Sequence, residues 1–207
     1  GLGDVYKRQA LKLKDLTCLL NELRAAGAAD RPDDVELLDV TRMCNGLVQT
    51  FAEYAETHKV GYRTEVGEGM LFPSARGTLS MVLNIVLSNA FRRSETGGEV
   101  FFGVSVVQDR LRVVVSNRGE GVDLGQIEFL SDRYRLLDYL ESRGKGGLSQ
   151  KGDMELAICH NLAAKLGGEF RIASEGDVTT VTLSFPELEI ARVTVSYTHL
   201  TLPTIRL

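Results

Sequence analysis

The chain of 207 residues has no tryptophan, only four prolines and only three cysteines. Cys18, Cys44 and Cys159 are scattered and odd in number, so they fit neither a disulfide framework nor a zinc site. We expect reduced, buried thiols in a cytosolic setting. No apolar run reaches membrane-spanning length. The chain also has no Walker A pattern, no Gly-x-Gly-x-x-Gly after a strand and no Ser-His-Asp set, and so lacks these familiar catalytic signatures.

Basic residues are outnumbered, with 24 Lys and Arg against 28 Asp and Glu and a formal net charge of -4. A chain that binds nucleic acid or an anionic membrane surface generally carries a basic patch and a net positive charge. We therefore expect no nucleic-acid partner and no direct membrane contact by this chain.

Both ends of the chain look foreign to the protein. Residues 4–9 and 195–200 are what the two strands of a sequencing-library transposon end encode. We expect residues 1–9 and 195–207 to be adapter-derived tails that do not belong to the folded domain. On this interpretation we expect the chain to be a fragment of a longer open reading frame.

Hydrophobic periodicity predicts a helix, strand, helix and hairpin, followed by a loop, a helix and a second hairpin. Residues 123–152 lack clear periodicity and contain several glycines, so we expect a functional loop there. This order is typical of an α+β fold, a two-layer sandwich with helices on one face of a mixed, mostly antiparallel sheet. Helices are expected over 10–26, 39–58, 74–93 and 153–166, and strands over 59–66, 70–72, 100–107, 111–116, 169–173 and 178–185.

The first predicted helix carries a leucine seam, formed by Leu13, Leu16, Leu20 and Leu23 at 3-4-3 spacing. Such a seam belongs either to an amphipathic helix that packs on its own domain or to the end of a dimerising helical stalk. The segment 10–33 is accordingly interpreted as a helix and a linker that precede a domain over 34–187.

The third predicted helix ends in Asn89-Ala90 followed by Arg92 and Arg93. These three polar residues lie at i, i+3 and i+4 and therefore share one side of the helix. An amide oxygen on a rigid element can ligate a magnesium ion that also binds phosphates, and Arg can bind the phosphates. The alternative is a plain helix end with two Arg side chains that complement the helix dipole.

The strand over 111–116 runs into Asn117-Arg118-Gly119-Glu120-Gly121. Glycines directly after a strand allow a ligand to approach the backbone without a side-chain clash. The carbonyl of the Asn117 side chain can accept a hydrogen bond from a ligand. The alternative is an ordinary glycine turn after a strand.

In this order, the two motifs resemble the N box and the first glycine box of the ATP-binding domains of sensor histidine kinases. These domains have the Bergerat fold of the GHKL ATPases, and the resemblance covers about residues 37–186. It implies that ATP and Mg²⁺ bind here, with Asn89 as the magnesium ligand. It further implies this set of ATP-binding residues: Asn89, Arg92, Arg93, Asn117, Gly119, Gly121, Gly146, Gly147, Gly152 and Thr180.

The sequence departs from the family pattern at three places. The second glycine box is degenerate, because Asp153 and Glu155 stand where glycines are expected and bring negative charge toward the phosphates. Asn117 replaces the usual Asp that accepts a hydrogen bond from the adenine amino group, so we expect weaker nucleotide binding because a charge-assisted bond becomes a neutral one. Ile85 stands at a site that is often polar in the N box.

The resemblance implies a catalytic domain that transfers the γ-phosphoryl group of Mg-ATP to a stalk His outside this chain, and on to an Asp of a response regulator. The receiver domain of that regulator is the expected partner, together with a second copy bound through the upstream helices. The expected location is the cytoplasm, whether the protein is soluble or membrane-anchored, with 188–194 starting a downstream linker. The departures favour an alternative, a pseudokinase signalling module with weak or no ATP binding. A serine kinase of the anti-sigma type shares the fold, but the leucine seam argues against it.

Overall fold

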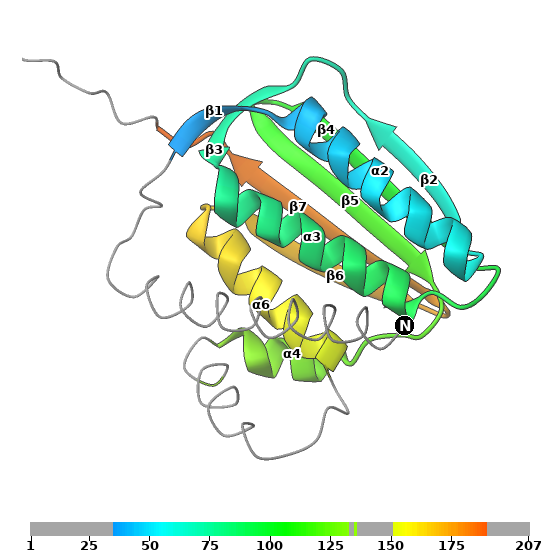
Figure 1. The fold of residues 1–207 in the computed structure, drawn as a ribbon. Helices are drawn as coiled ribbons and strands as arrows, with labels where there is room; N and C mark the ends of the chain where they lie inside the picture. Colours follow the sequence, from blue (N-terminus) through cyan, green and yellow to red (C-terminus); the bar gives the residue numbers. More distant parts are fainter. Residues whose placement is uncertain (1–34, 133–134, 136–150, 190–207) are drawn as a thin grey trace, which may run out of the picture.

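One five-stranded sheet forms the centre of the molecule. The computed structural model describes residues 35–132, 135 and 151–189, with the backbone alone for 151–153 (Figure 1). The strand order is β2-β4-β5-β7-β6, with β2 parallel to β4 and every other pair antiparallel. The strands are β2 (Gly61–Val66), β4 (Glu99–Val107), β5 (Arg110–Arg118), β6 (Glu169–Glu175) and β7 (Val178–Pro186).

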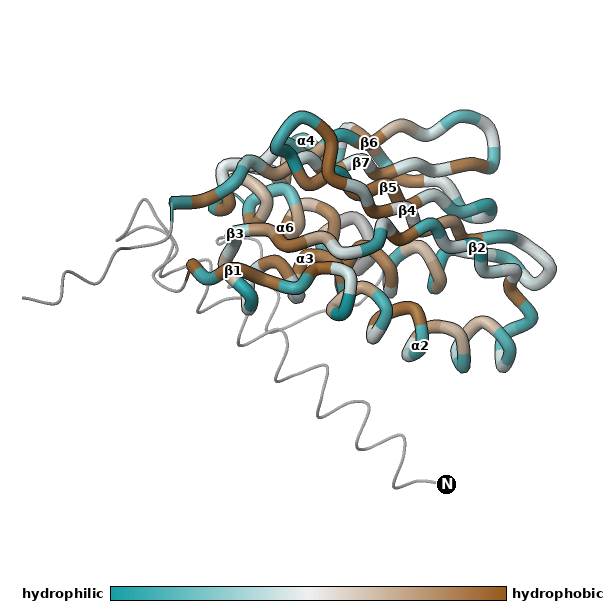
Figure 2. Tube along the Cα trace, turned by 90° about the horizontal axis from the view of Figure 1, so that it is seen from above, coloured by the Kyte–Doolittle hydropathy of each residue, from teal (hydrophilic) through white to brown (hydrophobic). Residues whose placement is uncertain are grey.

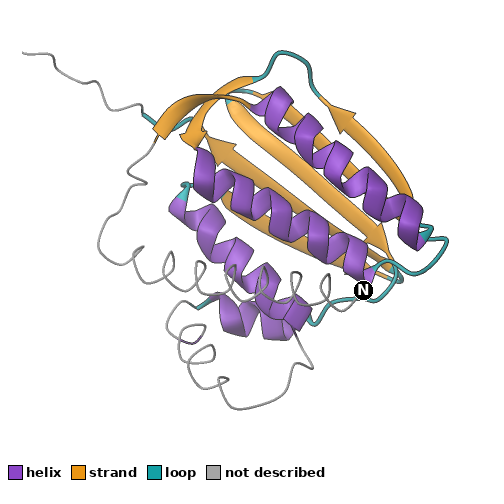
Figure 3. Cartoon of the chain, viewed as in Figure 1, coloured by secondary structure: helices purple, strands orange, loops and turns teal. Residues whose placement is uncertain are grey.

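Helices cover one face of this sheet, as Figure 3 shows, and the view from above places α2 and α3 together on one side of the strands (Figure 2). The described helices are α2 (Val40–His58), α3 (Arg76–Arg93), α4 (Leu124–Ser131) and α6 (Lys151–Lys165). A separate antiparallel pair, β1 (Val35–Asp39) and β3 (Leu71–Ala75), precedes α2 and α3. The prediction of a two-layer α+β sandwich with a mixed, mostly antiparallel sheet is confirmed.

Local chemistry accounts for where the elements begin and end. The Asp39 carboxylate accepts a hydrogen bond from the Arg42 N–H at 2.9 Å and caps α2. Lys59 ends that helix in the left-handed region, with φ of 55°. Gln108 and Asp109, both at positive φ, make the two-residue turn between β4 and β5, which suits the twist of a hairpin.

The core lies between the helices and the sheet. Alternate residues of β5, Leu111, Val113 and Val115, are buried toward the helices, while the residues between them are more exposed. The helix α3 lies in the middle of the layer and buries residues around much of its circumference, which explains its weak amphipathic pattern. Its fully buried apolar residues are Leu79, Val82, Leu83, Val86 and Leu87.

The structure adds two elements that sequence patterns did not predict. Residues 35–39 form β1, where no strand was expected, with Leu38 as its one fully buried side chain. The expectation of an irregular loop is wrong for 124–131, which is α4, capped by the Asp123 side chain. This helix buries only Ile127 and Leu130, and two buried apolar residues are too few to give a recognisable helical periodicity in the sequence.

In the part of the chain that the structure describes, no helix has the length and apolar character needed to span a membrane. The leucine seam and both expected adapter tails lie outside the described residues.

Candidate functional site

Buried polar side chains gather at one end of the layer between α3 and the sheet. Asn89, Asn117 and Thr179 are each exposed by 4% or less. Asn89 lies in the last turns of α3, and Asn117 lies near the end of β5, opposite Thr179 at the start of β7. Figure 1 shows this end of α3 beside the end of β5 and the start of β7. A cluster of buried polar side chains at the end of a helix–sheet layer is a candidate ligand site.

The segment after β5 is fixed against the end of α3. Gly119 pairs with Ser94 in an isolated bridge, and the Glu120 N–H donates to the Arg93 carbonyl at 2.9 Å. The Gly119 N–H donates to the Asp177 carbonyl at 2.8 Å. A Cβ atom at Gly119 would lie 2.1 Å from the Arg93 carbonyl oxygen, so only glycine fits there.

The Arg93 side chain adds a second link to this segment, because its Nη1 donates to the carbonyl oxygen of Gly121. A Cβ atom at Gly121 would lie 3.6 Å from the Ser174 hydroxyl oxygen. The predicted residues Arg93, Gly119 and Gly121 therefore meet at one place, where Arg93 holds the glycine segment against α3.

Asn117 is the polar centre of the cluster. Its Nδ2 is buried and has no hydrogen-bond partner in the protein. The neighbouring Thr179 hydroxyl lies 3.4 Å from the Ser174 hydroxyl, and either can donate. An unmatched buried donor costs free energy, so this end of the sheet is prepared for an acceptor from outside the protein.

The predicted Thr180 lies on the wrong side of β7 for this cluster. It pairs with Ser116 across the sheet, whereas Thr179 pairs with Asn117 and is buried. Because side chains alternate along a strand, a shift of one residue moves a side chain to the other face. Thr179 and Ser174 are the residues that sequence reasoning missed. The alternation of buried and more exposed residues along the strand was the sequence signal that could have identified Thr179.

Arg92 is held by an acidic partner. Its guanidinium donates to both carboxylate oxygens of Glu155, with Nη1 at 3.2 Å from Oε1. The Glu155 side chain is 14% exposed and that of Arg92 is 38% exposed. Arg92, which was predicted to contact the phosphates, thus pairs with Glu155, which was predicted to repel them.

The buried thiol of Cys159 lies in the same helix as Glu155. Burial, with a smaller contribution from the Glu155 carboxylate, raises the pKa of Cys159 well above its ordinary value.

The remaining predicted residues lie near the start of α6 or outside the described residues. Gly152 is in the first turn of α6, whereas Gly146 and Gly147 lie outside the described ranges. Within those ranges, no three His, Cys, Asp or Glu side chains are arranged to hold a metal ion.

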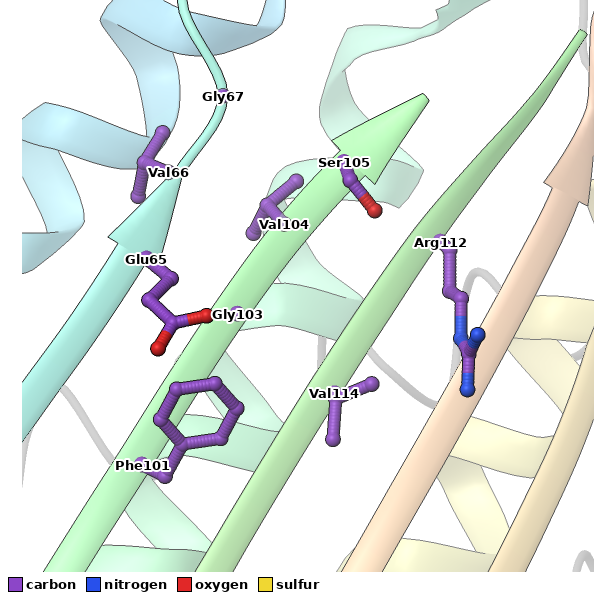
Figure 4. A pocket seen from close by; sticks show the side chains of 9 residues that line it. All are labelled: Glu65, Val66, Gly67, Phe101, Gly103, Val104, Ser105, Arg112 and Val114. Atoms are coloured by element: carbon purple, nitrogen blue, oxygen red, sulfur yellow. The ribbon is translucent and has the colours of Figure 1, made fainter. Parts of the chain in front are cut away.

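A separate open hollow of about 480 Å³ lies along β2, β4 and β5 (Figure 4). Its lining includes Phe101, Gly103 and Val114, which alternate with residues that face the core. It therefore opens mainly on the face of the sheet that the helices leave uncovered. None of the residues of the polar cluster lines it.

Two curated sensor kinases are similar to the chain in sequence. SenX3 of Mycolicibacterium smegmatis, a sensor-like histidine kinase, is 27% identical over 85% of this chain and 45% of its own length. The sensor histidine kinase WalK of Bacillus subtilis is 26% identical over 83% of this chain and 28% of its own length. The chain thus spans less than half the length of these relatives.

Solved structures share the fold. The histidine kinase ShkA, solved at full length with AMPPNP, matches 89% of this chain and 37% of its own, with a TM-score of 0.64 and 19% identity. The catalytic domain of the histidine kinase ThkA, in a nucleotide-free form, matches 74% of this chain and 96% of its own, with a TM-score of 0.60 and 14% identity.

The model of one protein family matches residues 75–189, which is more than half of the chain and includes Asn89, Asn117 and Thr179. The resemblance to the ATP-binding domains of sensor histidine kinases is confirmed by this match and by the two curated relatives. The chain belongs to the family of histidine kinase-, DNA gyrase B- and HSP90-like ATPases.

Proposed function

We propose that this chain is the ATP-binding catalytic domain of a sensor histidine kinase. The observation that supports this most directly is the convergence of Asn89, Asn117 and the segment 119–121 at one end of the helix–sheet layer. Two buried amides give a nucleotide polar partners, and the contacts of segment 119–121 with the end of α3 hold this edge of the site in place. Membership of the ATPase family and the similarity to SenX3 and WalK support the same assignment.

The residues fit a magnesium–nucleotide complex. Mg²⁺ prefers oxygen ligands and keeps several waters, so one amide oxygen together with phosphate oxygens is a suitable set. Asn89 would hold the ion, which when bound neutralises charge on the phosphates. Asn117 would face the base. Gly121 would leave room for the nucleotide, whereas Gly119 lets the backbone pack against Arg93. Arg92 lies one turn beyond Asn89 and contacts the phosphates when it leaves Glu155.

The chemistry proposed for these residues is mainly positioning. Phosphoryl transfer has a loose transition state, so catalysis depends on alignment and on stabilisation of charge rather than on a protein nucleophile. The short contacts of Arg93 and Glu120 keep the glycine segment fixed on α3. The protein therefore pays little ordering entropy at this part of the site when a nucleotide binds.

The wider assignment is also part of this proposal. The domain extends over 34–187, after the end of a dimerisation helix and linker at 10–33 and before a linker at 188–194, with adapter-derived tails at 1–9 and 195–207. The acceptor is a His of a stalk outside this chain, and the phosphoryl group passes to an Asp of a response regulator. A solved complex of ThkA with the response regulator TrrA, which shares this fold with a TM-score of 0.61, supports that partner. We propose a homodimer in the cytoplasm, either soluble or part of a membrane-anchored sensor.

A pseudokinase is the second candidate, and one observation favours it. Arg92, the cation expected at the phosphates, is engaged by Glu155 in a two-point ion pair. If the pair persists with nucleotide present, the domain loses a phosphate contact and retains a carboxylate near the phosphates. The fold would then serve signalling contacts with weak or no ATP binding.

A titration of the full chain with a fluorescent ATP analogue tests the proposal. We expect metal-dependent binding at micromolar concentration, lost in Asn89→Ala and without Mg²⁺. Asn84→Ala is the matched control, because Asn84 lies on the same helix but is exposed and bonds only to its own helix at Ser80. Absence of binding by the folded wild-type chain would reject the kinase and leave the pseudokinase.

A further inference from the structure

We propose that Asn117 makes the nucleotide site tolerant of either exocyclic group at position 6 of a purine, so that guanine and hypoxanthine nucleotides bind alongside ATP. This inference rests on the proposed function, because it concerns the base specificity of the same site. It starts from an atom that the fold leaves unmatched, the buried Nδ2 of Asn117.

The pairing of β5 with its neighbouring strands determines where Asn117 lies. It is 4% exposed, lies in β5 opposite Thr179, and precedes by two residues the glycine that is locked onto α3. Asn117 is buried on the face of the sheet that the helices cover. A ligand that enters this end of the layer therefore meets a buried amide with an unused donor.

An amide and a carboxylate differ in the hydrogen bonds that they can make with a purine base. Adenine presents an amino donor at position 6, whereas guanine presents a carbonyl acceptor there. A carboxylate only accepts, so it matches adenine and is repelled by a carbonyl. An amide carries an acceptor and a donor, and rotation about its last bond exchanges them. Asn117 can consequently satisfy either base.

The neighbours of Asn117 reinforce this tolerance. The polar side chains closest to it in the sheet register are the hydroxyls of Thr179 and Ser174, which are 3.4 Å apart and in which either oxygen can be the donor. A hydroxyl, like an amide, donates or accepts as its partner requires. The nearby acid Asp177 is turned to Arg118, which it contacts at 3.3 Å, and its carbonyl is used by Gly119. Among the described side chains beside Asn117 in the sheet register, the two hydroxyls can donate or accept, and neither is a carboxylate that only accepts.

Competition binding with the full chain tests the inference. ATP, GTP and ITP each displace a fluorescent ATP analogue in the presence of Mg²⁺, and their dissociation constants are compared. ITP has the position-6 carbonyl without the 2-amino group of guanine, so it separates hydrogen bonding from steric exclusion of that amino group. For the wild type we expect ITP to bind within about tenfold of ATP, since no hydrogen-bond mismatch arises.

The variant Asn117→Asp should widen the preference for ATP over ITP by about tenfold or more, because a carboxylate then faces a carbonyl. The control Asn84→Asp adds the same charge at an exposed position of α3 and should leave the ratio unchanged. A wild-type preference for ATP above tenfold, or an unchanged ratio in a folded Asn117→Asp, would overturn the inference alone. If Asn117→Asp does not fold, the ratio of the wild-type dissociation constants for ITP and ATP alone tests the inference. If the folded wild type binds none of the three nucleotides, the proposed function fails as well.

Discussion

Arg92 at the end of α3 and Glu155 near the start of α6 form a two-point ion pair across 63 residues of sequence. A bidentate guanidinium–carboxylate pair has the same geometry as a guanidinium on two phosphate oxygens. Glu155 therefore occupies the hydrogen-bonding fork that a phosphate would need. The charge that seemed to oppose a polyanion is instead neutralised by the residue expected to bind it.

Replacement of Glu155 by Gln should increase the affinity for Mg-ATP, by about three- to tenfold, since Arg92 is released and a negative charge is removed. Fluorescence titration measures the change. The double variant Glu155→Gln with Arg92→Gln should lose the gain. Glu169→Gln serves as a control, because Glu169 pairs with Arg110 at the other end of β5. Equal affinity of Glu155→Gln and the wild type would contradict competition between Glu155 and phosphate.

The same substitution should reduce stability only slightly, by about 1 kcal/mol or less, because the Arg92 side chain is 38% exposed and solvent weakens the pair. Urea unfolding of both proteins at matched salt measures the difference. A loss of several kcal/mol would show that the pair is a main structural support of the α3–α6 contact.

Replacement of Gly119 by Ala should destabilise the domain by about 2–4 kcal/mol, because the new Cβ has no room beside the Arg93 carbonyl. The matched control is Gly46→Ala in α2, where no atom lies within 4 Å of the new Cβ. That change should stabilise the protein by about 0.5–1 kcal/mol through helix propensity. Denaturant midpoints measure both, and equal effects at the two glycines would disprove the close approach.

The stability should fall as the pH drops below about 6.5, with His160 as one cause. Burial lowers the pKa of His160 below its ordinary value of 6.5, and its buried Nδ1 has no partner in the protein. Below that pH the unfolded chain takes up a proton that the folded chain does not, so unfolding is favoured. Urea unfolding at about pH 7.5 and 5.5 should show that the free energy of unfolding falls less in His160→Leu than in the wild type. An identical fall in both proteins would exclude a contribution from His160.

The thiols of Cys44 and Cys159 should not react in the folded protein. Burial raises the pKa of Cys44 to about 12, and both side chains are fully buried. Because the thiolate is the reactive form, a disulfide reagent at about pH 8 should label neither. In a Cys18→Ser variant, two thiols should appear only on unfolding. Rapid labelling of the native variant would contradict the packing of α2 and α6 described above.

Local sequence patterns determined most of the secondary structure. The predicted helices over 39–58 and 74–93 agree with α2 and α3 within about two residues, and the hairpin over 100–116 agrees with β4 and β5. These elements are long and strongly patterned, so hydrophobic period and turn residues suffice. The family resemblance also predicted roles for Asn89 and Asn117, and the fold places both at one end of the layer.

Tertiary structure decided what each of these residues faces. Contacts between distant segments decide that Arg92 pairs with Glu155 and that Thr179 rather than Thr180 lies beside Asn117. Such contacts also decide that residues 124–131 form α4. An ion pair forms where two side chains meet in space, and the sequence separation of Arg92 and Glu155 does not encode that meeting. Strand register determines which of two adjacent threonines is buried, because one residue of shift exchanges the faces of the sheet.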